Sequence, residues 1–507
     1  MIKHSFKLLC KHIIITPNEQ KLFQKLKNAT VDRDDVTIRI AGGWVRNKLL
    51  AMKSEQKEWS IDEENKDIDI ALDNINGSDF VNSIINIEKE PLRSYTVKLN
   101  PEKSKHLETA SIVIDGYNID CNGLRSDIYS QDSRIPLITK GTPLSDALRR
   151  DITINTLFYN IHTQEIEDHT QQGLKDLSEC LIRTPLSPFE TLLEDPLRAF
   201  RVLRFATKFH FAIEPQLMGV IKSVDFRKTV LKKVSRERIN TEFNKLMTKP
   251  AYALQYFKYL VETGLVEIVY HHTPNPSLPF QNSLPYLELG NSQSVNTKVL
   301  DTLEFRHSLI FYPMVLDNLL SLTDITKILR DFKSPNKEIS QTLSILRLSQ
   351  VLSTIKSHYT QDTQHTNTSI ESYLIDSPTN FKTHLFPLLL ELRKSHQFLL
   401  SIHLCRIHSQ INDNNNNNNS EQFWNDVEAL ISIKCYPLSK IKYSLTQEDV
   451  FENVEIVKSG KCSGTGFTSL MNELIYHQFS KHNFKSNHIQ PISKQEAIQF
   501  LNSLPNK

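Results

Sequence analysis

The apolar and polar residues of the first third of the chain follow a pattern of short strands. Between residues 36 and 165, runs rich in β-branched residues alternate with turns. Such runs predict strands, whereas the segment 146–161 has the spacing of a helix. Interleaved strands and helices of this kind predict an α/β or α+β unit. The predicted strands are TIRIA (37–41), DIDIAL (67–72), ASIVID (110–115) and NIDCNGL (118–124).

From about residue 190 onward the pattern becomes helical. Apolar residues recur at intervals of three and four, as in Leu193, Leu197 and Phe200. Because these intervals place side chains on one face of a helix, we expect helices over most of the remaining chain. Two polar stretches, 356–383 and 412–420, interrupt them, and the second, with its run Asn414 to Asn419, predicts a solvated loop.

Composition narrows the class of protein. The 507 residues include 60 Lys and Arg and 58 Asp and Glu, a net charge of +2. A uniformly basic chain that coats nucleic acid is therefore excluded, although a local basic groove is not. The six cysteines form no C-x-x-C pair, which argues against a disulfide framework or a zinc ribbon and favours a reducing compartment. No apolar run approaches the roughly 20 residues that cross a bilayer.

A glycine pair stands where a predicted strand meets a predicted helix. In IRIAGGWVRNKLL (38–50), Gly42 and Gly43 follow the strand and Arg46 lies in the first turn of the helix. Backbone amides at such a turn, with a guanidinium beside them, suit a phosphate. By itself the pair is more often only a tight turn, and the P-loop and dinucleotide-binding spacings are both absent.

Two acids lie two residues apart on the next predicted strand. Asp67 and Asp69 of KDIDIAL share one face, and Ile68 and Ile70 point the other way. Neighbouring carboxylates repel each other, so this arrangement favours a divalent cation between them, and two such ions can clamp a reacting phosphate. The alternative is a solvated strand face. Asp120, on a later predicted strand, is the third candidate acid.

A dense charge cluster, Arg149-Arg150-Asp151, lies near the start of the segment 146–161. Its guanidinium groups suit a triphosphate, and the Asp151 carboxylate suits a ribose hydroxyl. The alternative explanation is an ordinary charged surface.

The segment LLEDPLRAFRVLRF places charged residues at helical intervals. Asp195 and Arg198 are three residues apart, and Glu194 precedes Arg198 by four, a spacing that predicts an ion pair. An acceptor beside a bidentate donor can pair with the edge of cytosine or adenine. Taken alone, a salt-bridged helix is the commoner explanation. Arg201 and Arg204 continue the basic row.

Together these segments resemble one family, the class II tRNA nucleotidyltransferases or CCA-adding enzymes, in their eukaryotic form. The resemblance covers residues 36–265 well and the rest poorly. One departure is Asn47, which stands where many relatives carry Asp. That Asp is not among the expected metal ligands. The matching segments are GGWVR with KDIDIAL (catalytic motif A), RRD at 149–151 (ribose-recognition motif B), 168–185 (hinge motif C), EDPLR at 194–198 (nucleotide-selecting motif D), SRERINTEF at 235–243 (motif E, which braces a helix turn), and 105–110 with 132–136 (the flexible loop).

The resemblance implies an α+β fold in which a polymerase-β-like nucleotidyltransferase head is followed by an all-helical neck, body and tail. The implied divisions are an N-terminal extension (1–35), the head (36–165), a helical neck with the nucleotide-selecting motif (166–270), and a helical body and tail with polar insertions (271–507). Lys232, Lys233, Arg236 and Arg238 are candidates for a tRNA-binding track near the neck, although a solvated helix face is the commoner meaning of such a run.

The resemblance also implies an activity. The tRNA 3′-hydroxyl would attack the α-phosphate of CTP twice and then that of ATP, releasing pyrophosphate each time. The implied partners are the tRNA acceptor arm, CTP and ATP, with no membrane and no obligate protein partner. The implied compartments are cytoplasm and nucleus, with the mitochondrion as a further option.

Carried over residue by residue, the resemblance assigns the site. Asp67 and Asp69 would bind two Mg²⁺ ions, with Asp120 as a third catalytic acid. The nucleotide ligands would be Gly42, Gly43, Arg46, Arg149, Arg150, Asp151, Glu194, Asp195, Arg198, Arg201 and Arg204.

Three alternatives stay open at the level of sequence. Two belong to the same superfamily, namely a poly(A) polymerase and an enzyme that adds only CC or only the final A. The flexible-loop segment favours full CCA addition. The third alternative is a non-catalytic RNA-binding relative, whose mark would be a broken acid pair, and here Asp67 and Asp69 are both present.

Overall fold

The computed structural model divides into two compact units. The first comprises residues 1–246 and 255–269, and the second comprises 247–254 and 270–507. Most of the predicted flexible loop, 105–108 and 132–136, lies outside the described residues. The structure describes residues 13–53, 66–87, 93–97, 109–128, 137–270, 278–292, 302–362, 369–375, 388, 398–412, 418–430 and 494–503.

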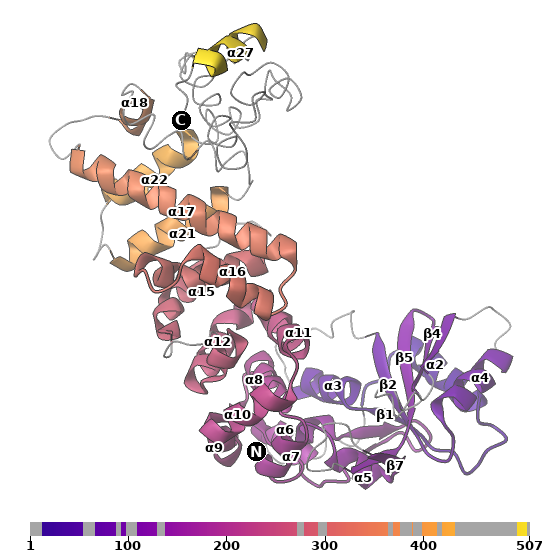
Figure 1. Ribbon diagram of the computed structural model, residues 1–507. Helices are drawn as coiled ribbons and strands as arrows, with labels where there is room; N and C mark the ends of the chain where they lie inside the picture. The colour runs from indigo at the N-terminus through magenta and orange to yellow at the C-terminus, as the bar shows by residue number, and fades with distance from the viewer. Residues whose placement is uncertain are drawn as a thin grey trace. The chain divides into compact units, whose positions relative to one another are not determined.

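The first unit contains a seven-stranded sheet (Figure 1), with strand order β3-β4-β5-β2-β1-β8-β9. The pair β2–β5 is parallel, and every other neighbouring pair in this sheet is antiparallel. The four predicted strands are all present. The seven strands are β1 (Ile38–Ala41), β2 (Asp67–Leu72), β3 (Arg93–Val97), β4 (Thr109–Ile114), β5 (Tyr117–Gly123), β8 (Phe158–Asn160) and β9 (Glu165–Glu167).

Helices cover one face of this sheet. Helix α3 (Gly43–Lys53) packs on β1 and β2, and α4 (Gly77–Ile87) packs on β4 and β5. Ile68, Ile70 and Ile119 are at most 1% exposed, because alternate strand residues point into this core. The other residues of β2 and β5 therefore point to the opposite face. Helix α2 (Pro17–Asn28) contacts α4, and β6 (Arg125–Ile128) pairs with β7 (Leu137–Lys140).

The segment 146–161 is not the single helix that its spacing predicts. Helix α5 (Pro143–Leu148) ends there, a 3₁₀ turn η3 (Thr153–Asn155) follows, and β8 returns to the sheet. The β-branched residues Ile152, Thr153 and Ile154 disfavour a continuous helix. Pairing of β8 with β1 decides the outcome, since that pairing buries Phe158 completely.

Helices make up most of the remaining first unit. Two short parallel strands, β10 (Leu181–Ile182) and β11 (Ala212–Ile213), interrupt the neck that we predicted to be all-helical. The helices are α6 (Gly173–Glu179), α7 (Pro188–Glu194), α8 (Arg198–Phe209), α9 (Pro215–Lys222), α10 (Val224–Lys233), α11 (Arg236–Met247), α12 (Pro250–Glu262, part of which belongs to the second unit) and α13 (Leu265–Val269).

Every regular element in the described part of the second unit is helical, as predicted. Helix α17 (Asn336–Asp362) packs against α15 (Leu303–Leu316) and α21 (Phe398–Asn412). None of the helices in the described ranges is long and apolar enough to span a bilayer. The other elements are η4 (Phe280–Ser283), α14 (Leu284–Ser292), α16 (Leu322–Asp331), α18 (Ile370–Ile375), α22 (Asn418–Leu430) and α27 (Lys494–Ser503).

Candidate active site

Three carboxylates form a row on the open face of the sheet. Asp67 and Asp69 are exposed on β2, and Asp120 is exposed on β5. The parallel register of these strands places Asp69 directly beside Asp120. The predicted alternation along β2 is confirmed, and the register of β5 adds the third acid to the same face.

Local hydrogen bonds hold this row of acids. Asn118 Nδ2 donates to Asp67 Oδ1 at 2.8 Å, and Ser111 Oγ donates to Asp120 Oδ1 at 2.5 Å. The pKa of Asp69 is raised by partial desolvation and by the negative charges of Asp120 and Asp67, while Arg150 opposes the rise. The row therefore holds mutual repulsion that a cation would relieve.

The donor chemistry of the row fits a hard divalent cation. Carboxylate oxygens are the ligands that such ions prefer. Within the described ranges, no set of three or more His, Cys, Asp or Glu side chains is arranged to hold an ion by itself. An ion of the magnesium type is ordinarily held by one or two carboxylates, with phosphate and water oxygens completing its shell. The residues thus fit a divalent metal that is coordinated jointly with a phosphate ligand.

The glycine turn lies next to these acids. Strands β1 and β2 pair antiparallel with Ala41 opposite Asp69, so Gly42 follows immediately beyond that pair. Gly42 has a φ of +64°, and a Cβ atom there would lie 2.8 Å from Arg150 Nη1. Glycine is required both for this backbone conformation and for the close approach of the guanidinium. Helix α3 begins at Gly43, so its N-terminal amides lie at the same turn.

Asp146 anchors the two arginines of the RRD cluster. Its carboxylate, 1% exposed, accepts from Arg149 Nε at 2.9 Å and from Arg150 Nη2 at 2.9 Å. Burial alone would raise the pKa of Asp146, but the charges of Arg150 and Arg149 keep it below the ordinary value. The sequence analysis missed this residue, although its spacing of three and four from two arginines was the available signal.

Asp151 is buried rather than open to solvent, with 6% exposure. Its Oδ1 accepts from the amide of Ile152 and from Asn155 Nδ2, both at 2.9 Å. Its Oδ2 accepts from Arg201 Nη2 at 2.6 Å and from Nε at 2.8 Å. Burial by itself would raise the pKa of Asp151, but Arg201 and Asn155 lower it to about 2. Asp151 therefore stays ionised and holds Arg201 in place.

The spacing of charged residues around Pro196 predicts one continuous helix, and this prediction is wrong. Helix α7 ends at Glu194, Asp195 is extended, and α8 begins at Arg198. The physical reason is that a residue before proline is disfavoured in the helical conformation. Asp195 Oδ2 accepts from Arg238 Nη2 of α11 at 2.7 Å.

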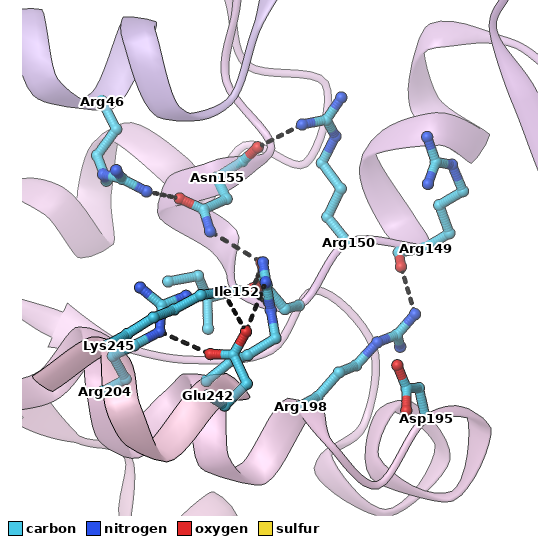
Figure 2. Close-up of polar contacts among 12 residues, drawn as sticks. Arg46, Arg149, Arg150, Ile152, Asn155, Asp195, Arg198, Arg204, Glu242 and Lys245 are labelled. Carbon is cyan, nitrogen blue, oxygen red and sulfur yellow. Dashed lines mark hydrogen bonds and ion pairs between the residues drawn. The ribbon is translucent and has the colours of Figure 1, made fainter. Parts of the chain in front are cut away.

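The predicted ion pair between Glu194 and Arg198 is confirmed at 2.8 Å. Arg198 also donates to the carbonyl of Thr191 at 3.0 Å and to that of Arg149 at 2.6 Å. These contacts leave the side chain 8% exposed and tie the start of α8 to the RRD cluster (Figure 2).

Arg204 contacts a carboxylate on α11. Glu242, 4% exposed, accepts from Arg204 Nε at 2.8 Å and from Lys245 Nζ at 2.6 Å, and lies 3.8 Å from Arg201 Nη1. Burial favours the neutral acid, yet these cations lower the pKa of Glu242. Sequence reasoning missed Glu242, because Arg204 lies 38 residues away and its contact with Glu242 depends on how α8 and α11 fold together.

Arg46 is buried, and its hydrogen bonds go to two neutral side-chain amides. It donates to Asn155 Oδ1 and, from Nη2 at 2.9 Å, to Asn47 Oδ1. Its guanidinium carbon lies 5.1 Å and 4.7 Å from the ring centroids of Phe205 and Phe209 on α8. Burial lowers the pKa of Arg46 to about 9, helped by Arg204 and Arg201 and opposed by Asp151.

Every residue that the sequence analysis selected for the site lies in the first unit. The acids lie on the neighbouring strands β2 and β5, next to the glycine turn that follows β1, and Arg150 lies against that turn. The other arginines pair with carboxylates, except Arg46, which donates to Asn47 and Asn155. Three of the four predicted tRNA-track cations make internal contacts. Lys233 donates to the carbonyl of Leu193, Arg236 to those of Ile268 and Val269, and Arg238 to Asp195.

Two family models match this chain. Residues 38–183 match the poly A polymerase head domain. Residues 210–275 match the model described as the probable RNA and SrmB-binding site of polymerase A. The first match contains the acids, the glycine turn and the RRD cluster.

Several curated fungal proteins are similar to the chain. It is 37% identical over 278 residues to the tRNA nucleotidyltransferase cca2 of Schizosaccharomyces pombe, covering 52% of this chain and 55% of that protein. It is 35% identical over 336 residues to the mitochondrial CCA tRNA nucleotidyltransferase of Saccharomyces cerevisiae, covering 63% and 59%. The chain thus spans a little over half the length of these relatives.

Solved structures share the fold across nearly the whole chain. A CCA-adding enzyme in complex with ATP aligns with a TM-score of 0.57 at 16% identity, covering 96% of this chain and 95% of that one. The Bacillus stearothermophilus CCA-adding enzyme in complex with CTP gives 0.55 at 18% identity, covering 96% and 98%. At such identities the likeness shows the fold alone, a polymerase-β-like head followed by a mostly helical remainder.

Proposed function

We propose that this chain is a CCA tRNA nucleotidyltransferase, which adds CCA to the 3′ end of tRNA without a nucleic acid template. CTP would be used twice and ATP once, with release of pyrophosphate at each step. The observation that carries the proposal is the position of Asp69, beside Asp120 on one side and opposite the residue before Gly42 on the other.

In the proposed reaction, the terminal ribose hydroxyl oxygen of tRNA bonds to the α-phosphorus of the nucleotide. The bond from that phosphorus to the bridging oxygen breaks, pyrophosphate leaves, and the hydroxyl proton passes to water. Asp67 and Asp69 would hold Mg²⁺, which when bound supplies charge neutralisation at the reacting phosphate. The N-terminal amides of α3 and the Arg150 guanidinium would orient the triphosphate.

Base selection would depend on Asp195 and Arg198. The carboxylate accepts from the exocyclic amine that cytosine and adenine share, and the guanidinium donates to a ring nitrogen. Uracil and guanine place other groups at these positions. The contacts of Arg198 with Glu194 and with the Arg149 carbonyl support a fixed orientation of its guanidinium.

The proposal is tested by nucleotide incorporation into tRNA transcripts that lack CCA or only the final A. With CTP alone we expect two residues on the first transcript, with ATP alone one residue on the second, and with both nucleotides a complete CCA end. Long A tails in the absence of CTP would instead identify a poly(A) polymerase. Addition limited to CC or to the last A would identify a partial enzyme.

We further propose that the protein serves the cytoplasm and the nucleus as well as the mitochondrion. The mitochondrial names of the relatives from Saccharomyces cerevisiae and Candida glabrata support the third compartment. Imaging of the full chain with a C-terminal fluorescent tag tests this proposal, and confinement to one compartment would contradict it.

A further inference from the structure

Asn155 joins three of the residues assigned to nucleotide binding. It ends the η3 turn and is 7% exposed. Its side-chain Oδ1 accepts from Arg46 Nη1, its Nδ2 donates to Asp151 Oδ1 at 2.9 Å, and its backbone carbonyl accepts from Arg150 Nη1 at 3.1 Å. Figure 2 shows Asn155 between Arg46 and Arg150.

The two partners of the amide require opposite ends of it. A guanidinium can only donate and an ionised carboxylate can only accept. The orientation of the Asn155 amide is therefore set by Arg46 on one side and Asp151 on the other. An Asp at this position could accept from Arg46 but would set a second negative charge against Asp151. An Ala would leave polar groups of both buried partners without this contact.

The partners of Asn155 lead to two parts of the site, the glycine turn and helix α8. Arg150 lies at the glycine turn, where its Nη1 would be 2.8 Å from a Cβ on Gly42. Asp151 holds Arg201 of α8 through two hydrogen bonds. Arg46 lies against Phe205 and Phe209 of the same helix. The side chain and the backbone carbonyl of Asn155 thus connect the turn that would bind phosphate with helix α8, which begins at Arg198.

We propose that Asn155 is a positioning residue that sets Arg46, Arg150 and Asp151 in one geometry for the triphosphate and the ribose. This inference rests on the proposed function. Loss of the amide lets Arg46 and Asp151 move independently, so affinity for the nucleotide falls together with preference for a ribose over a deoxyribose. For comparison, removing a residue that orients a metal ligand lowers metal affinity or activity by roughly 10- to 100-fold.

Asn160 provides a matched control for this experiment. It is also buried, with 6% exposure, and lies at the end of β8 in the first unit. Its Nδ2 donates to Glu167 Oε1 at 2.8 Å, and its Oδ1 accepts from the amides of His162 and Thr163. Asn160→Ala therefore removes a buried amide of the same kind at a position away from the nucleotide residues.

The test is equilibrium binding of CTP and dCTP, measured by calorimetry on the full chain for wild type, Asn155→Ala, Asn155→Asp and Asn160→Ala. We expect both Asn155 variants to weaken CTP binding by roughly tenfold or more and to reduce the CTP-to-dCTP affinity ratio, while Asn160→Ala keeps the wild-type ratio. The isosteric Asp variant retains the side-chain volume if the Ala variant fails to fold.

Two outcomes separate this inference from the proposed function. An unchanged CTP-to-dCTP ratio in both Asn155 variants, or the same change in Asn160→Ala, overturns the positioning role. If the wild-type chain binds CTP but never extends tRNA, the proposed function is rejected. The CTP-to-dCTP ratios of the variants then still test the positioning role of Asn155. Absence of CTP binding by the wild type overturns both.

Discussion

The carboxylate of Asp195 forms its ion pair with Arg238 of α11, at 2.7 Å, whereas Arg198 pairs with Glu194. The two residues expected to read the base are therefore held by different partners, and neither neutralises the other. Arg238 is 39% exposed, so Asp195 is fixed near the surface where a nucleobase can approach it.

We predict that Arg238→Ala lowers discrimination of CTP against UTP, because Asp195 loses the donor that orients its carboxylate. Arg238→Lys should restore part of the discrimination. The measurement is the ratio of kcat/KM for the two nucleotides. Lys222→Ala, which breaks an exposed pair with Glu262 at 2.7 Å, is the control. An equal change in both variants would argue against a specific role for Arg238.

Arg198→Ala should reduce CTP-versus-UTP discrimination by roughly 10- to 100-fold, the range for a lost bidentate base contact. Binding of tRNA, measured by filter retention, should change less. Because Arg198 also donates to the Thr191 and Arg149 carbonyls, the thermal unfolding of the variant needs to be recorded in parallel. Unchanged selectivity in a folded variant would mean that Arg198 only supports the structure.

Asp67→Ala should abolish nucleotide addition while tRNA binding persists, since the carboxylate is exposed and its removal leaves the core of β2 intact. Incorporation of labelled CTP and a gel-shift assay measure the two properties. Asp73→Ala, at the end of the same strand segment, alters the ion pair with Arg39 instead and serves as the control. Retained turnover in Asp67→Ala would reject the metal assignment.

The N-terminal helix α2 is tied to α3 by a buried ion pair. Glu19 Oε2 lies 2.7 Å from Lys48 Nζ, and its Oε1 accepts from Trp44 Nε1 at 3.0 Å. Burial alone would raise the pKa of Glu19, but the hydrogen bonds from Lys48 and the Thr16 amide lower it below 4.5. Its contribution to stability is therefore complete above that value and is lost as pH falls through the folded-state pKa.

We predict that Glu19→Gln destabilises the first unit by about 3 kcal/mol at pH 7, because Lys48 stays buried without its partner. Urea unfolding at pH 7 and near pH 3 measures the effect. The difference from wild type should shrink at the lower pH, which lies below the ordinary Glu pKa of 4.5, because the stabilisation by ionised Glu19 is then partly lost. A difference that is independent of pH would contradict the ion-pair explanation.

Asn47 accepts from Arg46 Nε at 3.1 Å and from Nη2 at 2.9 Å. A carboxylate at this position would replace two hydrogen bonds from a cation to a neutral amide by an ion pair. We therefore expect Asn47→Asp to stabilise the first unit by about 1 kcal/mol, measured as a higher thermal unfolding temperature. Asn47→Ala should lower that temperature, and a loss of stability in Asn47→Asp would show that desolvation of the new charge outweighs the pairing.

Local periodicity in the sequence determined much of this protein. The alternation of Asp67 and Asp69 with Ile68 and Ile70 predicted which face of β2 is open, and it holds because successive strand side chains point to opposite faces. The Gly42 turn and the Glu194–Arg198 pair were likewise readable, since each involves residues within one turn of each other. The family motifs extended this reading to the fold of the head and its helical remainder.

Contacts between distant segments were decided by the tertiary structure alone. The parallel register that places Asp120 beside Asp69, the ion pair of Asp195 with Arg238, and the bonds of Asn155 to Arg46 each join residues that no short-range period relates. Their formation depends on the packing of whole helices and strands, which is a property of the folded chain. The break between α7 and α8 was also readable from the sequence, because Pro196 disfavours a helical conformation for Asp195. The helical spacing of the charged residues around it predicted one helix instead.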